Sequence, residues 1–202
     1  MLVLCSDGLS GGNLRRAVQV RLDGRKTAAL VVTADHVYKE RNRHVDRCRA
    51  ELESLGLSVE TVDIDVSPAE ELLRYDVVEF IGGNPFYLMQ SIRRHAAQDA
   101  LGSLAQTGIL IGWSAAAFAF GPTLELVYRY SPEMSFQGMT DLQGCALTQV
   151  EVLPHYSRFL HRFDAFEERC CAYEAARGVK VIRLDDGEGV IIDGEDMEIC
   201  RL

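Results

Sequence analysis

The sequence has little positive charge and no long apolar run. Of its 202 residues, 21 are Lys or Arg and 30 are Asp or Glu, which gives a formal net charge of −9 at pH 7. Nucleic-acid binding needs clustered basic residues, and no such stripe is present, so we exclude this partner. No segment approaches the roughly 18 apolar residues of a membrane span, and the N-terminus lacks the pattern of a signal peptide. We therefore expect a cytoplasmic protein that binds no membrane.

Cysteine and proline patterns exclude further classes. The six cysteines form no C-x-x-C pair and no Cys/His spacing of the zinc type, and the acidic residues of 185–196 do not match an EF-hand loop. We therefore expect no metal and interpret these acids as solvated turn charges. The five prolines are scattered and no repeat or linker is present. We expect residues 1–202 to form a single domain, since this length suits one core.

Short apolar and β-branched runs predict strands along the chain. They cover residues 2–5, 28–33, 59–64, 77–81 and 109–111. Helical spacing between them predicts a helix within 36–55 and another after Asn84. Strands alternating with helices imply an α/β fold with a mostly parallel sheet covered on both faces. Two further apolar runs flank Asp193-Gly194 and predict a C-terminal β-hairpin.

A serine follows the predicted central strand, in the run Gly112-Trp113-Ser114-Ala115-Ala116, and a helix-prone segment comes next. A serine at such a tight turn projects its hydroxyl above the sheet edge, and the following amide faces developing negative charge. The small neighbours suit a crowded backbone. Ser114 is therefore a candidate nucleophile, and on spacing alone a serine that caps the helix is the alternative.

A second glycine-rich turn, Gly82-Gly83-Asn84, follows the strand predicted at 77–81. Neighbouring parallel strands would place it beside Ser114, at the sheet edge where ligands collect. Glycine amides there can donate hydrogen bonds to an oxyanion. A turn that requires positive φ is the alternative explanation.

A nucleophilic serine needs a base, and the sequence has five histidines. His36, His44 and His95 lie among charges on predicted helices, where we expect solvated side chains. His155 follows an apolar run at a predicted strand end, where side chains reach an active-site edge. His155 is therefore the preferred base, and His161 is the fallback.

The base must be oriented by a carboxylate. Four acids between Ser114 and His155 are open candidates: Glu125, Glu133, Asp141 and Glu151. Glu133 is preferred because Pro132 interrupts regular structure in its loop and could hold the side chain in place.

These motifs together resemble the aspartyl dipeptidase (peptidase E) group of peptidase family S51, which is related to the cyanophycinases. The likeness covers nearly the whole chain. It rests on the segments Gly24 to Ala29, Gly82 to Phe86, Gly112 to Ala115 and Pro154 to Tyr156. The resemblance implies a three-layer α/β/α fold like that of class I glutamine amidotransferases.

The resemblance also implies roles for individual residues. It implies a triad of Ser114, Glu133 and His155, with the Gly83 and Ala115 amides as oxyanion donors. Asn84 and an arginine after the histidine would contact the substrate, because an arginine can pair with a carboxylate through two hydrogen bonds. The candidate arginines are Arg158, Arg162 and Arg169, of which Arg169 stands in the most similar context.

We therefore expect a serine peptidase that hydrolyses short peptides, with dipeptides bearing an N-terminal aspartate as substrates and no cofactor. The family motif has glycine where this chain has Ala116, and the extra methyl group could crowd the site. Two alternatives stay open: a cyanophycinase-like β-aspartyl peptidase, and a catalytically silent binding or regulatory relative. The sequence also leaves open whether the chain forms a homodimer.

Overall fold

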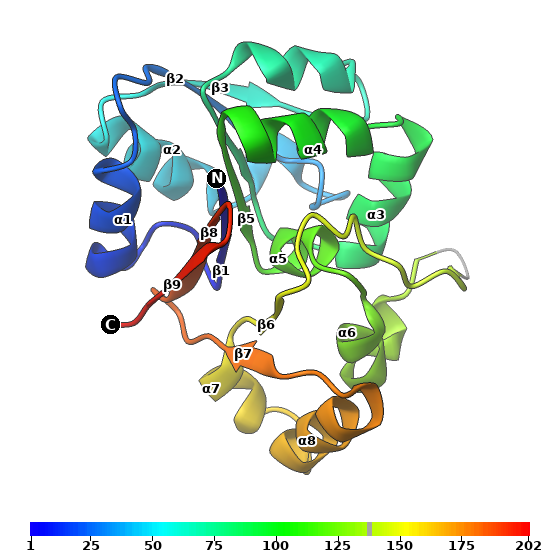
Figure 1. Cartoon of the computed structure of the whole chain (residues 1–202). Coiled ribbons are helices and arrows are strands. Elements are labelled where there is room, and N and C mark those ends of the chain that lie inside the picture. Colours follow the sequence, from blue (N-terminus) through cyan, green and yellow to red (C-terminus); the bar gives the residue numbers. More distant parts are fainter. Residues whose placement is uncertain (137–138) are drawn as a thin grey trace.

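The computed structural model describes residues 1–136 and 139–202. At its centre is a seven-stranded sheet in the order β3-β2-β4-β5-β1-β8-β9 (Figure 1). Its strands are β1 (Leu2–Cys5), β2 (Thr27–Val31), β3 (Ser58–Val62), β4 (Val77–Phe80), β5 (Ile109–Trp113), β8 (Gly189–Asp193) and β9 (Asp196–Cys200).

The sheet is mostly parallel, as predicted. β3, β2, β4, β5 and β1 run in the same direction, and β8 pairs antiparallel with β1. β8 and β9 form an antiparallel hairpin around Gly194, which has a φ of 61°. The expected α/β class and the expected C-terminal hairpin are therefore confirmed.

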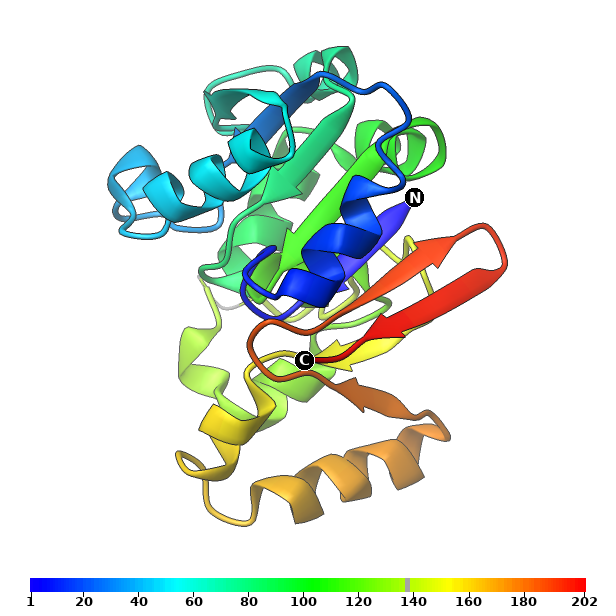
Figure 2. The same ribbon diagram turned by 90° about the vertical axis from the view of Figure 1, so that its left-hand side faces the viewer.

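Helices cover both faces of this sheet (Figure 2). α1 (Gly12–Gln19) and α2 (Val45–Ser54) pack on one face, and α3 (Pro85–Arg94), α4 (Gln98–Thr107) and α5 (Ala115–Phe120) pack on the other. The two faces follow from the alternation of side chains along a strand. In β1, Leu2 and Leu4 join the core under α3 to α5, whereas Val3 and Cys5 join the core under α1 and α2.

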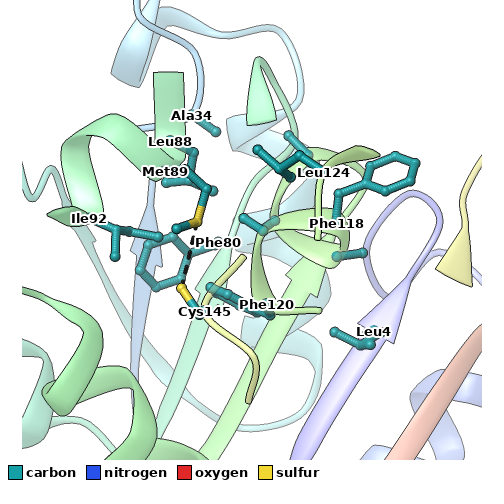
Figure 3. Packing of buried hydrophobic residues seen from close by; sticks show 14 of the residues in the cluster. Leu4, Ala34, Phe80, Leu88, Met89, Ile92, Phe118, Phe120, Leu124 and Cys145 are labelled. Carbon is teal, nitrogen blue, oxygen red and sulfur yellow. Dashed lines mark hydrogen bonds between the residues drawn. The ribbon is translucent and has the colours of Figure 1, made fainter. Parts of the chain in front are cut away.

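The core under α3 to α5 is closely packed (Figure 3). The rings of Phe80 and Phe120 meet edge to face at 5.2 Å between centroids. The Cys145 thiol donates to the sulfur of Met89 at 3.7 Å. This packing fixes α5 against the sheet, and α5 begins directly after Ser114.

A second group of elements lies beyond the carboxyl ends of β1 and β5 (Figure 1). It consists of α6 (Glu125–Tyr130), the 3₁₀ turn η3 (Pro132–Met134), β6 (Glu151–Leu153), α7 (Tyr156–Leu160), α8 (Phe166–Arg177) and β7 (Val181–Arg183). β6 and β7 pair in parallel as a separate two-stranded sheet. Among the described residues no helix is both long and apolar enough to cross a bilayer.

The helix predicted within 36–55 begins later than expected. Residues 39–41 form only a 3₁₀ turn, η1 (Lys39–Arg41), and α2 starts at Val45. The cause is Asp35, whose Oδ1 accepts hydrogen bonds from the Val37 and Tyr38 amides at 3.1 and 3.0 Å. Such a local side-chain turn competes with helical hydrogen bonding.

The helix predicted after Asn84 is two helices, α3 and α4, rather than one. The chain turns between them at Ala96, which has a φ of 50° and so cannot continue an α-helix. A second 3₁₀ segment, η2 (Ala69–Arg74), leads into β4 and packs in the core under α3 to α5.

One carboxyl group lies in the middle of the sheet without solvent contact. Glu79 of β4 is 0% exposed, and neither side-chain oxygen has a hydrogen-bond partner among the described residues. Burial and the nearby charge of Glu51 raise the pKa of Glu79 to about 8, whereas Arg47 opposes the shift. Glu79 is therefore protonated in the folded protein at neutral pH.

We expect Glu79→Gln to reduce the loss of stability at rising pH. Between about pH 4.5 and pH 8 the unfolded chain releases this proton and the folded protein retains it, so the free energy of unfolding falls with pH. The slope contributed by one group is at most about 1.4 kcal/mol per pH unit. Urea unfolding at pH 5, 6.5 and 8 measures it, and the variant should be the more stable protein at pH 8.

The matched control is Glu53→Gln, since Glu53 is an exposed glutamate on α2. It should leave the pH dependence of the wild type unchanged. Parallel stability curves for the wild type and Glu79→Gln would contradict the assignment of this proton to Glu79.

Candidate active site

Ser114 occupies a strained turn between β5 and α5. Its φ of 53° and ψ of −107° are unfavourable for a residue with a side chain, at a typical cost of about 1–3 kcal/mol. The turn is held from both sides. The Ser114 amide donates to the Cys5 carbonyl at 3.0 Å, and a Cβ at Gly112 would lie 2.6 Å from the Phe120 ring, so α5 packs closely only on glycine.

His155 makes a hydrogen bond with this serine. Its Nε2 lies 3.0 Å from Ser114 Oγ. His155 follows β6 and precedes α7 in a left-handed conformation with a φ of 57°. The strand before it, β6, belongs to the two-stranded sheet and not to the central sheet. The second group of elements thus brings a histidine to the carboxyl edge of the central sheet.

The carboxylate bound to His155 is Asp186. Nδ1 of His155 lies 2.6 Å from Asp186 Oδ1, which also accepts a hydrogen bond from Ser6 Oγ at 2.9 Å. The buried Ser6 hydroxyl in turn accepts from the His155 amide at 2.9 Å. The second oxygen of Asp186 pairs with Arg158. Ser114, His155 and Asp186 therefore form a continuous chain of hydrogen bonds.

Glu133, the expected acid, does not occupy this position. It lies on the exposed 3₁₀ turn η3 and makes no hydrogen bond or ion pair with any described residue. Glu133 instead lines a cavity beside Ser114, as does its neighbour Met134. The sequence argument considered only acids between Ser114 and His155, so it did not include Asp186.

Asp186 lies in an acidic turn that the sequence analysis interpreted as a set of solvated charges. It stands in the turn Asp185-Asp186-Gly187, directly after the run of β7, where its charge was attributed to solvation. Gly187 has a φ of 88°, and its amide donates to Asp7 at 2.7 Å. The acid of a catalytic triad can follow the histidine in chain order, so this turn was a candidate.

The two expected oxyanion donors lie at the same edge. The Gly83 amide donates to no acceptor among the described residues. A Cβ at Gly83 would lie 2.2 Å from the Ala34 carbonyl oxygen, so only glycine fits. Ala115 is the first residue of α5, where helical amides have no acceptor within the helix. Both amides are available for a ligand.

Asn84, expected to contact the substrate, has structural contacts instead. Its Oδ1 accepts from the Phe86 and Tyr87 amides and caps α3, and its Nδ2 donates to the Met134 carbonyl at 2.8 Å. Asn84 therefore connects the Gly83 turn to the segment that carries Glu133.

Arg169, the preferred arginine, points elsewhere. It is exposed on α8 and its guanidinium donates to the Arg129 carbonyl. Arg162 instead lines the cavity that contains Ser114, and its guanidinium lies 5.2 Å from the centre of the Phe163 ring. Among the three candidate arginines, Arg162 is thus the one that lines this space.

We call this space the Ser114 cavity. It measures about 90 Å³. Its walls are mostly aromatic or aliphatic, with Glu133 and Arg162 as the charged side chains. The lining residues are Gly83, Pro85, Ser114, Ala115, Phe118, Val127, Tyr130, Ser131, Glu133, Met134, Phe159, Arg162 and Phe163.

Ala116 does not crowd this cavity. It is 0% exposed, packs in the core under α5 and is absent from the lining. Its carbonyl carbon lies against Gly112, 3.0 Å from where a Cβ at that position would be. The methyl group that distinguishes Ala116 from glycine is therefore accommodated in the protein interior.

A second cavity, of about 540 Å³, also borders the Gly82-Gly83 turn. We call it the Arg43 cavity. It is lined by Asp35, Tyr38, Arg41, Asn42, Arg43, His44, Gly82, Gly83 and Trp113. His44, expected to be a solvated helix residue, is half-buried and stands edge-on to Trp113 at 5.7 Å between ring centres.

One group in the described part of the chain has donor atoms close enough to share a cation. These atoms, on Cys48, Glu51 and Glu79, lie within 4.8 Å of one another. Two features oppose metal binding. Glu51 already pairs with Arg47 at 2.6 Å, and burial raises the pKa of the Cys48 thiol far above its usual value, so that the thiolate is disfavoured.

Known proteins resemble this chain over most of its length. An uncharacterized peptidase of Listeria monocytogenes is 27% identical over 182 residues, which make up 88% of this chain and 87% of the relative. Peptidase E of Escherichia coli is 27% identical over 153 residues, 74% of this chain and 65% of that protein.

Solved structures agree on the fold. The crystal structure of a candidate peptidase E protein from Listeria monocytogenes superposes with a TM-score of 0.77 at 26% identity, covering 100% of this chain and 98% of that one. A peptidase from an acI-B1 actinobacterium superposes with a TM-score of 0.73 at 19% identity, covering 98% and 86%. The second likeness shows the fold alone.

The sequence profile described as Peptidase family S51 matches residues 3–200. The match spans the elements that supply Ser114, His155 and Asp186, and it agrees with the motifs from which the sequence alone indicated the same family. The chain belongs to peptidase family S51 and is similar to peptidase E.

Proposed function

We propose that the chain is a serine peptidase that hydrolyses short peptides and prefers an N-terminal aspartate. The observation that carries this proposal is the hydrogen-bonded series Ser114, His155 and Asp186, with distances of 3.0 and 2.6 Å. A helix-capping role for Ser114 is not supported, because its side chain makes no capping hydrogen bond. Its conformation instead presents the hydroxyl to a base.

The geometry supports acyl transfer to water. His155 Nε2 accepts the Ser114 proton as Oγ attacks the peptide carbonyl, and the Gly83 and Ala115 amides stabilise the oxyanion. His155 then protonates the leaving amine, and a water molecule hydrolyses the acyl-enzyme by the same route. Asp186 accepts a hydrogen bond from the Nδ1–H of His155, which fixes the tautomer that leaves Nε2 free to act as the base.

The Ser114 cavity suits a single N-terminal residue. Its volume of about 90 Å³ accommodates one small side chain beside the nucleophile. Within it, the exposed carboxylate of Glu133 is suited to the free α-ammonium group of a substrate, and the Arg162 guanidinium to an aspartate side chain. Glu133 thereby keeps a place in the site, as a binding residue and not as the triad acid.

Ser114→Ala should abolish hydrolysis of a dipeptide such as Asp-Leu while the protein stays folded. Removing the nucleophile of a triad lowers kcat on the order of 10⁴-fold or more. Turnover of purified protein on a dipeptide panel measures the effect, and a β-aspartyl dipeptide in the panel separates the cyanophycinase-like alternative.

A fluorophosphonate label provides the control for a catalytically silent relative. The wild type should be labelled at Ser114 and the Ser114→Ala protein should not, by mass spectrometry of the modified peptide. Unchanged turnover in Ser114→Ala would refute the proposal, and so would a wild type that neither turns over a peptide nor reacts with the label.

Asp186→Asn and Glu133→Gln should have different kinetic effects. Asp186→Asn favours the wrong tautomer of His155, and by analogy with other triads we expect kcat to fall about 10⁴-fold. Glu133→Gln removes a charged partner of the substrate, so KM should rise about 10- to 100-fold with kcat little changed. Steady-state kinetics on Asp-Leu distinguish the two.

Each variant serves as the control for the other, because both replace a carboxylate by an amide of the same shape. If kcat falls strongly in Glu133→Gln and turnover is normal in Asp186→Asn, Glu133 and not Asp186 is the acid of the triad. Thermal unfolding of both proteins checks that neither loss reflects misfolding.

A further inference from the structure

The Arg43 cavity lies directly beside the proposed nucleophile. Gly83 lines both this cavity and the Ser114 cavity, so the two spaces share one wall. A Cβ at Gly82 would lie 3.1 Å from the Ser114 Cβ and 2.5 Å from the Trp113 ring. The turn is therefore packed directly against Trp113 and Ser114, and only glycine fits at position 82.

Two arginines that line the Arg43 cavity have no carboxylate partner among residues 1–136 and 139–202. The Arg41 guanidinium makes no hydrogen bond or ion pair with any described residue. Arg43 donates through Nε to His44 Nε2 at 3.1 Å, and its terminal nitrogens have no partner in the described part of the chain. Other basic residues of this segment are paired, as Lys39 is with Asp63 and Asp65.

The charge in this cavity is positive although the protein carries a formal net charge of −9. The one carboxylate of the lining, Asp35, accepts hydrogen bonds from the Val37 and Tyr38 amides and from Asn42 at 2.6 Å, and its oxygens are thus engaged. Burial lowers the pKa of His44, and the guanidinium groups around it lower the pKa further. These groups belong to Arg43, Arg47 and Arg158.

The position of the cavity relative to the scissile bond decides which part of a substrate would reach it. In the proposed function the N-terminal residue fills the Ser114 cavity, and its carbonyl oxygen lies at the Gly83 amide. Because Gly83 also lines the Arg43 cavity, the residue after the scissile bond is within reach of that cavity. Its volume of about 540 Å³ is ample for the residue after the scissile bond.

We propose that Arg41 and Arg43 bind a carboxylate on the residue that leaves, and so select peptides in which this residue bears one. In a dipeptide the carboxylate is the C-terminus, and in a longer peptide an acidic side chain would supply the same chemistry. This inference rests on the proposed function, since it takes Ser114 as the point of cleavage.

The experiment compares three substrates that share the same N-terminal aspartate. They are Asp-Leu, Asp-Leu with an amidated C-terminus, and Asp-Asp with an amidated C-terminus. The proteins are the wild type, the double variant Arg41→Ala/Arg43→Ala, and Arg16→Ala as a matched control. Arg16 is an exposed arginine on α1 outside both cavities.

We expect the wild type to hydrolyse Asp-Leu about 10- to 100-fold better than its amide, the usual effect of losing a hydrogen-bonded charge. The double variant should lose the same factor on Asp-Leu, mainly as a rise in KM, and should treat the acid and the amide alike. Arg16→Ala should match the wild type. If the wild type hydrolyses amidated Asp-Asp as well as Asp-Leu, a side-chain carboxylate on the leaving residue is sufficient for recognition. If it hydrolyses amidated Asp-Asp poorly, the arginines recognise the C-terminal carboxylate.

Calorimetric titration of Asp-Leu into Ser114→Ala protein, with and without the two arginines, measures binding apart from catalysis. Binding that depends on the arginines supports the inference even if the wild type shows no turnover, in which case only the proposed function fails. Turnover or binding of Asp-Leu that is the same with and without Arg41 and Arg43 overturns the inference and leaves the proposed function in place. Absence of both turnover and binding overturns both.

Discussion

The hydrogen bond between His155 and Asp186 is the interaction on which the arrangement of the site depends. His155 comes from the end of β6 and Asp186 from the turn after β7, so the two strands of the small sheet supply one residue each. Ser6, at the end of β1, bonds to both residues and ties them to the central sheet. The small sheet is therefore not an appendage, because the contacts of Ser6 with His155 and Asp186 fix its position beside Ser114.

The strain at Ser114 is the second constraint, and the surrounding packing maintains it. A positive φ at a residue with a side chain persists only where neighbouring contacts leave no alternative. Here the Cys5 carbonyl holds the Ser114 amide, and α5 presses on Gly112 through Phe120. Hydrophobic packing of α5, which is buried along its whole length, thus holds Ser114 in its strained conformation as well as contributing to stability.

The sequence predicted the part of the site that depends on strand order and local turns. Ser114 and Gly83 follow neighbouring parallel strands, and alternation of strands and helices was enough to bring them to one edge. Asp186 could not be found in this way, because its position depends on how β7 pairs with β6, a non-local contact without a periodic signature. The choice between Arg162 and Arg169 likewise depends on the path of the chain after α7, which brings Arg162 and not Arg169 to the cavity.

The Arg43 cavity exists because a single side chain, Asp35, prevents the helix that the sequence pattern predicts within 36–55 from beginning before Val45. Residues 36–44 have a composition that suits an exposed helix, and on such a helix Arg41 and Arg43 would point away from each other at 100° per residue. Asp35 accepts hydrogen bonds from the Val37 and Tyr38 amides, and the α-helix begins only at Val45. Both arginines then line the cavity that borders the Gly82-Gly83 turn. Because of one short polar side chain at the end of a strand, residues that were expected on a helix surface instead line a positively charged cavity beside the Gly82-Gly83 turn.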